Sequence, residues 1–315
     1  TLSDEDDQPE GQSGAQVRGT LVFPGNEVQI TPASPALAGA TGTLRFTQSG
    51  FDITDAAAQL YGGPVRFEGG MRPREGGQPP VLRFRGQGSA SAEGLQKADL
   101  GFVSRLFGKA SGSADYTAQL AFKGGAPEIM VASSLQGLAL DVPAPLNKAA
   151  ADRLPLRFES TVLESTDDRA RTDRLVVELG APAAPLLALQ YERDLRGEEP
   201  VVSRGSVAVG LAAGESAPLP AQGVLANLQL DQLDVDAWKR VFSDATGRAV
   251  GSPVTPLANS TTDADAGRSY LPTVLAVRAQ KITADGRSFN KVVVGGSRDG
   301  GLWRANVNAD ELNGY

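Results

Sequence analysis

The feature that most restricts the fold of this chain is a period-two alternation of apolar and polar residues in short runs. Residues 44–46 (Leu-Arg-Phe), 51–53 (Phe-Asp-Ile) and 82–84 (Leu-Arg-Phe) each place a charged residue between two apolar ones. Side chains two residues apart project from the same face of a β-strand. Most runs end at Gly, Pro, Asp or Ser, which favour turns. The pattern therefore predicts many strands joined by short loops.

The alternation continues from about residue 17 to the end of the chain and predicts on the order of 18 to 20 strands. Long helical patterns between strands are missing, so parallel βα units are not expected. We predict a mainly β protein, a long antiparallel meandering sheet. A sheet this wide must curl, close or split into packed layers. A curled sheet with an open apolar groove and a sandwich with a filled core both fit the alternation.

Two segments have the pattern of short amphipathic helices. Residues 99–107 begin with Asp99 and residues 234–242 begin with Asp234, and each Asp is a suitable N-cap. The segments align at an offset of 135 residues, and each follows a Leu-Gln pair in a strand-like run. This predicts a repeated unit of strands followed by a helix, with two unrelated capping helices as the alternative. Phe107 and Trp238 are expected to gate a groove or to cover a sheet edge.

Composition changes divide the chain into four parts. Residues 1–16 are acidic and rich in Gln, Gly and Ser, which predicts a disordered tail. Residues 17–242 hold strands and both helices, residues 243–269 are predicted to be a flexible linker, and residues 270–315 return to strands. The chain starts at Thr1, and no stretch approaches the roughly 20 apolar residues of a membrane span. We interpret it as a fragment of a longer protein, with any anchor elsewhere.

The absence of two residue types narrows the possible chemistry. The chain has no His and no Cys, which excludes Ser-His-Asp and Cys-His catalysis, imidazole or thiolate metal sites and disulfides. Its net charge is 30 − 37 = −7, which argues against binding to nucleic acid. We expect no cofactor and no enzymatic activity.

Three short motifs resemble catalytic or calcium-binding patterns but lack the other residues that those patterns require. Residues 288–291 match the S-x-x-K pattern, in which Ser288 would be a nucleophile and Lys291 a base, but the accompanying S-D-N and K-T-G motifs are absent. The Asp-x-Asp pairs at 234–236 and 263–265 lack the other ligands of a calcium loop. A helix cap and a solvated loop explain these pairs better, so no catalytic or metal-binding residue is predicted.

One segment resembles a known family. Residues 138–148 (Leu-Ala-Leu-Asp-Val-Pro-Ala-Pro-Leu-Asn-Lys) are similar to the L-x-L-P-A-P-L-G-K signature of YhdP-type AsmA-like proteins, with Asn147 in place of Gly. The resemblance extends over about residues 17–315 and is supported by further similar stretches at 42–46, 58–69, 233–238, 271–279 and 301–314.

This resemblance implies a repeating β-groove and non-enzymatic transport of phospholipid between membranes, with acyl chains in the groove. It also implies a periplasmic location, anchoring to the inner membrane by a region outside this chain, a role in outer-membrane biogenesis, and inner- or outer-membrane partner proteins. A structural, adhesive or partner-docking β-array without lipid is the alternative.

If the groove exists, the alternating positions predict its floor. The expected lipid-contacting residues are large and apolar and come from strands along most of the chain: Leu44, Phe46, Phe51, Ile53, Leu60, Phe67, Phe84, Leu120, Phe122, Leu138, Leu140, Phe158, Val177, Leu187 and Leu189. A register error of one residue would move a strand's set to the opposite face.

Overall fold

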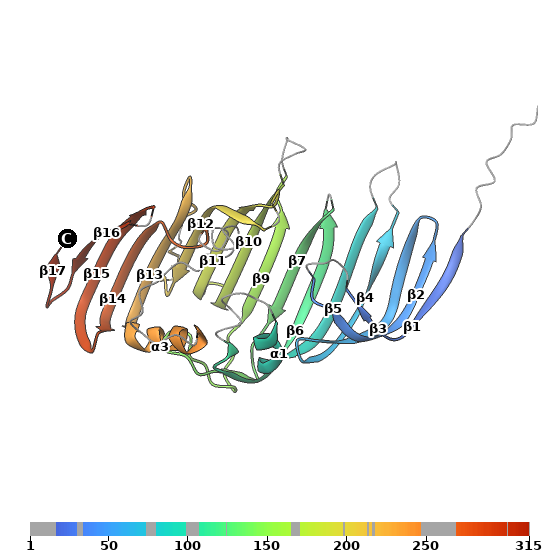
Figure 1. Cartoon of the computed structure of the whole chain (residues 1–315), viewed down its shortest axis with the longest axis horizontal. Coiled ribbons are helices and arrows are strands. Elements are labelled where there is room, and N and C mark those ends of the chain that lie inside the picture. The colour runs from blue at the N-terminus through green and yellow to red at the C-terminus, as the bar shows by residue number, and fades with distance from the viewer. Residues whose placement is uncertain are drawn as a thin grey trace, which may run out of the picture.

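The computed structural model describes residues 17–29, 34–73, 80–98, 107–123, 125–164, 171–197, 199–212, 214–215, 218–246, 269–300 and 302–314. In these residues the elements with assigned bounds are seventeen strands and two helices, α1 and α3. The mainly β class predicted from the alternation is confirmed. Figure 1 shows the strands side by side along the long axis, with β1 at one end and β17 at the other.

In the first half of the chain the described elements are β1 (Arg18–Val28), β2 (Leu37–Thr47), β3 (Gly50–Leu60), β4 (Gly63–Arg72), β5 (Val81–Ser91), α1 (Ala92–Lys97), β6 (Ala110–Lys123), β7 (Ala126–Ser133), β8 (Leu138–Leu140) and β9 (Leu156–Val162). The second half contains β10 (Thr172–Ala181), β11 (Ala184–Asp194), β12 (Val201–Val209), β13 (Gly223–Asp234), α3 (Val235–Thr246), β14 (Val274–Ala284), β15 (Arg287–Asp299), β16 (Leu302–Asn308) and β17 (Asn313–Gly314).

Sixteen of the described strands form one ladder that follows chain order, from β1 to β7 and then from β9 to β17. Strand β8 is left out of this order because it pairs with the start of β6, where Leu138 faces Gly112 and Leu140 faces Ala110. At about 4.8 Å per strand, sixteen strands span roughly 70 Å. The sheet thus forms a long open surface.

Two strand pairs differ from the antiparallel expectation. The β12–β13 and β13–β14 pairs are parallel, whereas the other strand pairs described are antiparallel. Parallel neighbours require a connection that returns the chain to the same end of the sheet. The two connections concerned are the one between β12 and β13 and the one between β13 and β14, which includes α3. The alternation does not report strand direction, so these returns were not predicted.

The two faces of the sheet differ in chemistry. Directly opposed residues share a face, so the pairings Phe84↔Leu120 and Val177↔Leu189 extend one apolar set from strand to strand. We call this side the apolar face. The other side, the charged face, carries cross-strand ion pairs such as Arg85–Glu68 and Arg157–Glu178.

Helix α3 confirms the helix predicted from Asp234. The Asp234 carboxylate accepts a hydrogen bond from the Ala237 amide at 2.8 Å, as expected of an N-cap. The helix ends at Thr246, so it extends into the segment assigned to the linker. Figure 1 shows α1 and α3 along the same edge of the sheet.

The structure does not describe most of the first predicted helix, the tail or the linker, and it does not support the proposed repeat. Residues 99–106 lie outside the described part of the chain, as do residues 1–16 and 247–268. Helix α1 differs from the sequence prediction, because it contains Leu95 and Gln96, which the alternation places at the end of a strand. The other Leu-Gln pair, at 228–229, does lie in a strand, β13. The two pairs therefore do not mark equivalent positions of a repeat.

Candidate functional site

Most of the predicted floor residues share one face of the sheet. Cross-strand partners connect Leu44 to Ile53, and connect Phe84 to Leu120. The same rule and the two-residue spacing within strands place thirteen of the fifteen predicted residues on the apolar face: Leu44, Phe46, Phe51, Ile53, Leu60, Phe67, Phe84, Leu120, Phe122, Phe158, Val177, Leu187 and Leu189. The other two, Leu138 and Leu140, lie on β8.

Most of these side chains are only half-buried. Along β5, and along β6 from Ala114 onward, positions on the apolar face are half-buried or buried, while their neighbours on the charged face are exposed or half-buried. Phe46 is 37% exposed, whereas Leu138 is 1% exposed and packs with Ala92 and Ala114. Leu138 is therefore a packed core residue, and the face around Phe84 and Leu120 is not covered by a second layer of described residues.

The apolar face continues beyond the residues predicted for it. Val131 opposes Phe158, and Leu189 opposes Val207. Further along, Val277 opposes Val294, which opposes Val307. These positions also alternate in the sequence, but only the register shows that they continue the same face.

The buried regions are small and contain few large side chains. Three clusters are present in the described residues: Leu37, Ala40, Ala58 and Val65; Ala92, Ala114 and Leu138; and Tyr191, Val202 and Val224. The largest fully buried side chains in the described residues are those of Leu138, Val224 and Asp173. A filled sandwich core would bury many more.

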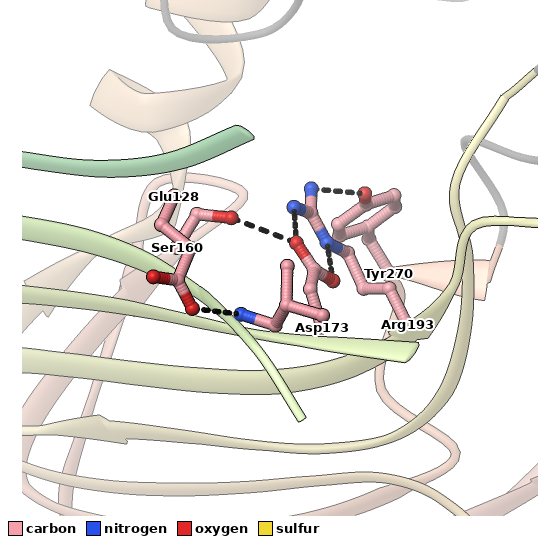
Figure 2. Close-up of polar contacts among 6 residues, drawn as sticks. Glu128, Ser160, Asp173, Arg193 and Tyr270 are labelled. Atoms are coloured by element: carbon pink, nitrogen blue, oxygen red, sulfur yellow. Dashed lines mark hydrogen bonds and ion pairs between the residues drawn. The ribbon is translucent and has the colours of Figure 1, made fainter. Parts of the chain in front are cut away.

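A polar cluster interrupts the apolar face where strands β9 to β11 begin or end (Figure 2). Asp173, which is 2% exposed, accepts hydrogen bonds from Arg193 Nε at 2.9 Å and from Ser160 Oγ at 2.8 Å. A second bond joins Arg193 Nη2 to Asp173 Oδ2. Arg193 Nη1 also donates to the Tyr270 hydroxyl at 3.3 Å. The ion pair thus connects the sheet to the segment that precedes β14.

The surroundings of this cluster favour the charged form of Arg193 and the neutral form of Tyr191. Burial opposes the charge on Arg193, but hydrogen bonds to Asp173 and Tyr270 outweigh it and raise the pKa of Arg193. Burial, with a smaller contribution from Tyr270, raises the pKa of Tyr191 to about 12. The Tyr191 and Tyr270 rings meet edge to face, with centroids 5.2 Å apart. Tyr270 therefore packs over part of the apolar face.

The Pro-Ala-Pro-Leu-Asn-Lys element forms a loop closed by its lysine. Lys148 is buried, and its Nζ donates to the carbonyl oxygens of Leu138 at 2.7 Å and Ala149 at 2.9 Å. Burial lowers the pKa of Lys148. Backbone hydrogen bonds between Leu140 and Lys148 close the loop further. The loop presents its Ala144 carbonyl to Trp238, whose Nε1 donates to it at 3.0 Å.

Both aromatic residues suggested as gates lie in packed contacts. Trp238 is joined to Ala144 as described, and Phe107 packs against the cluster that contains Ala92 and Leu138. Helix α3 is also held by Asp236, which accepts from the Asp285 and Gly286 amides at 2.9 Å each. These contacts match the role of covering an edge.

The residues considered above as catalytic groups or calcium ligands make other contacts or do not lie together. Ser288 and Lys291 lie on β15, where residues three apart do not share a face, and Lys291 Nζ pairs with Asp310 at 3.1 Å. Asp234 and Asp236 accept backbone hydrogen bonds, while Asp263 and Asp265 lie outside the described residues. The described residues contain no group of three or more acidic side chains that could hold a metal ion.

Comparison with known proteins gives one match. No helix in the described part of the chain is long and apolar enough to cross a bilayer. No curated protein and no solved structure matches the chain significantly. The YhdP protein family matches over residues 7–315. The match covers nearly the whole sequence and agrees with the resemblance of residues 138–148, so the chain belongs to the YhdP family.

Proposed function

We propose that this protein carries phospholipid along the apolar face, with the acyl chains against the sheet and the headgroups in solvent. Its family is one of bacterial envelope proteins related to lipid transport. The transport requires no catalytic residue or cofactor. In this proposal the protein acts in the periplasm, and segments outside the present chain anchor it to the inner membrane and connect it to membranes and partner proteins.

The observation that carries the proposal is the continuity of a half-exposed apolar face across the ladder. Direct cross-strand partners run from Val131 through Phe158, Val177 and Leu189 to Val207 without a break. The alternative, a structural array with a sealed interior, is not favoured by this exposure. Large apolar side chains left half-exposed over a continuous area are typical of a surface that binds something apolar.

The physical need for such a surface follows from the cost of hydrating a lipid tail. Each CH₂ kept from water contributes about 0.8 kcal/mol, so a 16-carbon chain costs roughly 12 kcal/mol to expose. A continuous apolar face lowers that cost at every position along the path. Because neighbouring strands offer similar side chains, a tail can move between them without a large barrier.

Lipid binding by the purified protein tests the proposal. Native mass spectrometry of the protein, mixed with phosphatidylethanolamine in detergent and then exchanged out of it, is expected to show lipid adducts. Leu120→Asp, on the apolar face, is expected to lose adducts, while Gln119→Asp, on the charged face of the same strand, keeps them. Circular dichroism establishes that both variants are folded. A folded wild-type protein that takes up no lipid would overturn the proposal.

A further inference from the structure

Two cavities adjoin where the 141–145 loop and α3 lie against the ends of β13 and β14. The first has a volume of about 620 Å³ and the second about 700 Å³. They share Ala144 and Gln232 in their linings. Each lies within the usual size range of small-molecule sites, and their contact allows one ligand to occupy both.

The first cavity has an apolar floor. Leu230, Ala279 and Val292 are successive cross-strand partners on the apolar face of β13, β14 and β15, and they are 7%, 5% and 3% exposed. Ala144 and Pro145 from the loop complete this part of the lining. The floor belongs to the same face that carries the proposed lipid path, so a tail on that face can enter this cavity.

The second cavity begins two residues further along the same strands, where the face becomes polar. Gln232 and Lys281 are cross-strand partners there, and Lys109 and Arg240 also contribute to the lining. The carboxylates are Asp141 and Asp234, and Asp234 already accepts the Ala237 amide as the cap of α3. Three cations against two carboxylates give 3 − 2 = +1, in a chain whose net charge is −7.

The walls of both cavities are held in place by contacts independent of any ligand. Trp238 joins α3 to the loop, and Asp236 joins α3 to the turn between β14 and β15. Lys148 fixes the base of the loop. A preformed site loses less conformational entropy on binding.

We propose that the two cavities form one binding site for a phospholipid with a net negative headgroup. A tail lies on the Leu230–Ala279–Val292 floor, and the phosphate lies near Lys281 and Arg240. The inference rests on the proposed function and adds a fixed position on the path at which the headgroup is recognised. Charge complementarity favours an anionic lipid over a zwitterionic or neutral one.

Short-chain lipids below their micelle concentration test the site. We expect wild type to bind dihexanoyl phosphatidylglycerol, followed by Trp238 fluorescence and calorimetry, more tightly than phosphatidylcholine or diacylglycerol of the same chain length. Removing two charges with Lys281→Gln and Arg240→Gln together is expected to weaken binding by on the order of tenfold or more. The matched control Arg66→Gln with Arg83→Gln, two exposed arginines on the charged face, is expected to bind like wild type.

The outcomes separate this site from the general function. Equal binding of phosphatidylglycerol and diacylglycerol, or an unchanged affinity of the Lys281/Arg240 variant, overturns the headgroup site. Binding of inorganic phosphate as tight as that of the short-chain lipid would indicate an anion site without a tail and also overturns it. If the site fails while long-chain adducts persist in native mass spectrometry, the transport proposal survives. Absence of all lipid adducts from the wild type overturns both.

Discussion

Arg193 and Asp173 form a two-bond ion pair on the apolar face of the sheet, with Arg193 Nε 2.9 Å from Asp173 Oδ1. They oppose each other directly on β11 and β10. Tyr270 hydrogen-bonds to the same guanidinium, so a segment 77 residues further along the chain is fixed against these strands. The pair therefore helps to position the described residues that directly precede β14.

Removing one member of this pair is expected to be more damaging than removing both. Asp173→Leu leaves the largely enclosed Arg193 guanidinium without its counter-charge, which is expected to lower the free energy of unfolding by about 3–5 kcal/mol. Asp173→Leu with Arg193→Met removes both charges and is expected to restore most of that loss. Urea unfolding measures both variants. A single variant as stable as the wild type would contradict a structural role for the pair.

Lipid contact is expected to alternate along each strand of the path. A photoreactive benzoylphenylalanine at Phe84, on the apolar face of β5, is expected to crosslink to phospholipid. The same group at Arg85, the next residue, faces the charged side and is expected not to. Mass spectrometry of the crosslinked protein gives the readout. Equal crosslinking at both positions would show that the lipid does not follow the apolar face.

The decrease of the free energy of unfolding at acidic pH is expected to depend in part on Glu192. This carboxylate lies between Arg204 and Arg174 on the charged face, and hydrogen bonds from Arg204 and then Arg174 hold its pKa below the ordinary 4.5. A lowered folded-state pKa means that the stabilisation is complete above about pH 4.5 and is lost as the pH falls through the lowered pKa.

Glu192→Gln removes this titration. Unfolding free energies of wild type and variant, measured from pH 7 to pH 3, are expected to differ most above pH 4.5 and to converge below it. A difference that stays constant down to pH 3 would exclude the titration of Glu192 as its cause.

The two tryptophans provide a matched test of how the loop is held. Trp238→Phe removes the hydrogen bond to the Ala144 carbonyl and is expected to lower the free energy of unfolding by about 0.5–1.5 kcal/mol. Trp303→Phe, at an exposed position on β16, is expected to change it little. Thermal unfolding distinguishes the two. Equal effects would indicate that the Trp238–Ala144 contact contributes nothing.

The local features of the fold were predictable from the sequence. The alternation at residues 44–46 and 82–84 predicted strands with one apolar side, because side-chain direction in a strand depends only on the spacing along it. The N-cap of α3 was equally accessible, since Asp234 and the Ala237 amide are three residues apart. Leu138 was predicted to lie on the floor but is enclosed, because its burial depends on packing with Ala92 and Ala114.

Thus the sequence by itself determined that the chain forms many strands, in which apolar residues alternate with polar ones and so gather on one side. Only the tertiary structure decided that these sides align over sixteen strands, that β8 pairs with β6, and that β12, β13 and β14 run parallel. It also brought Asp173 to Arg193 and Trp238 to Ala144, pairs that are 20 and 94 residues apart. The reason is physical: periodicity acts between neighbours in the chain, whereas register, strand direction and cavities arise from contacts between residues that are distant in it.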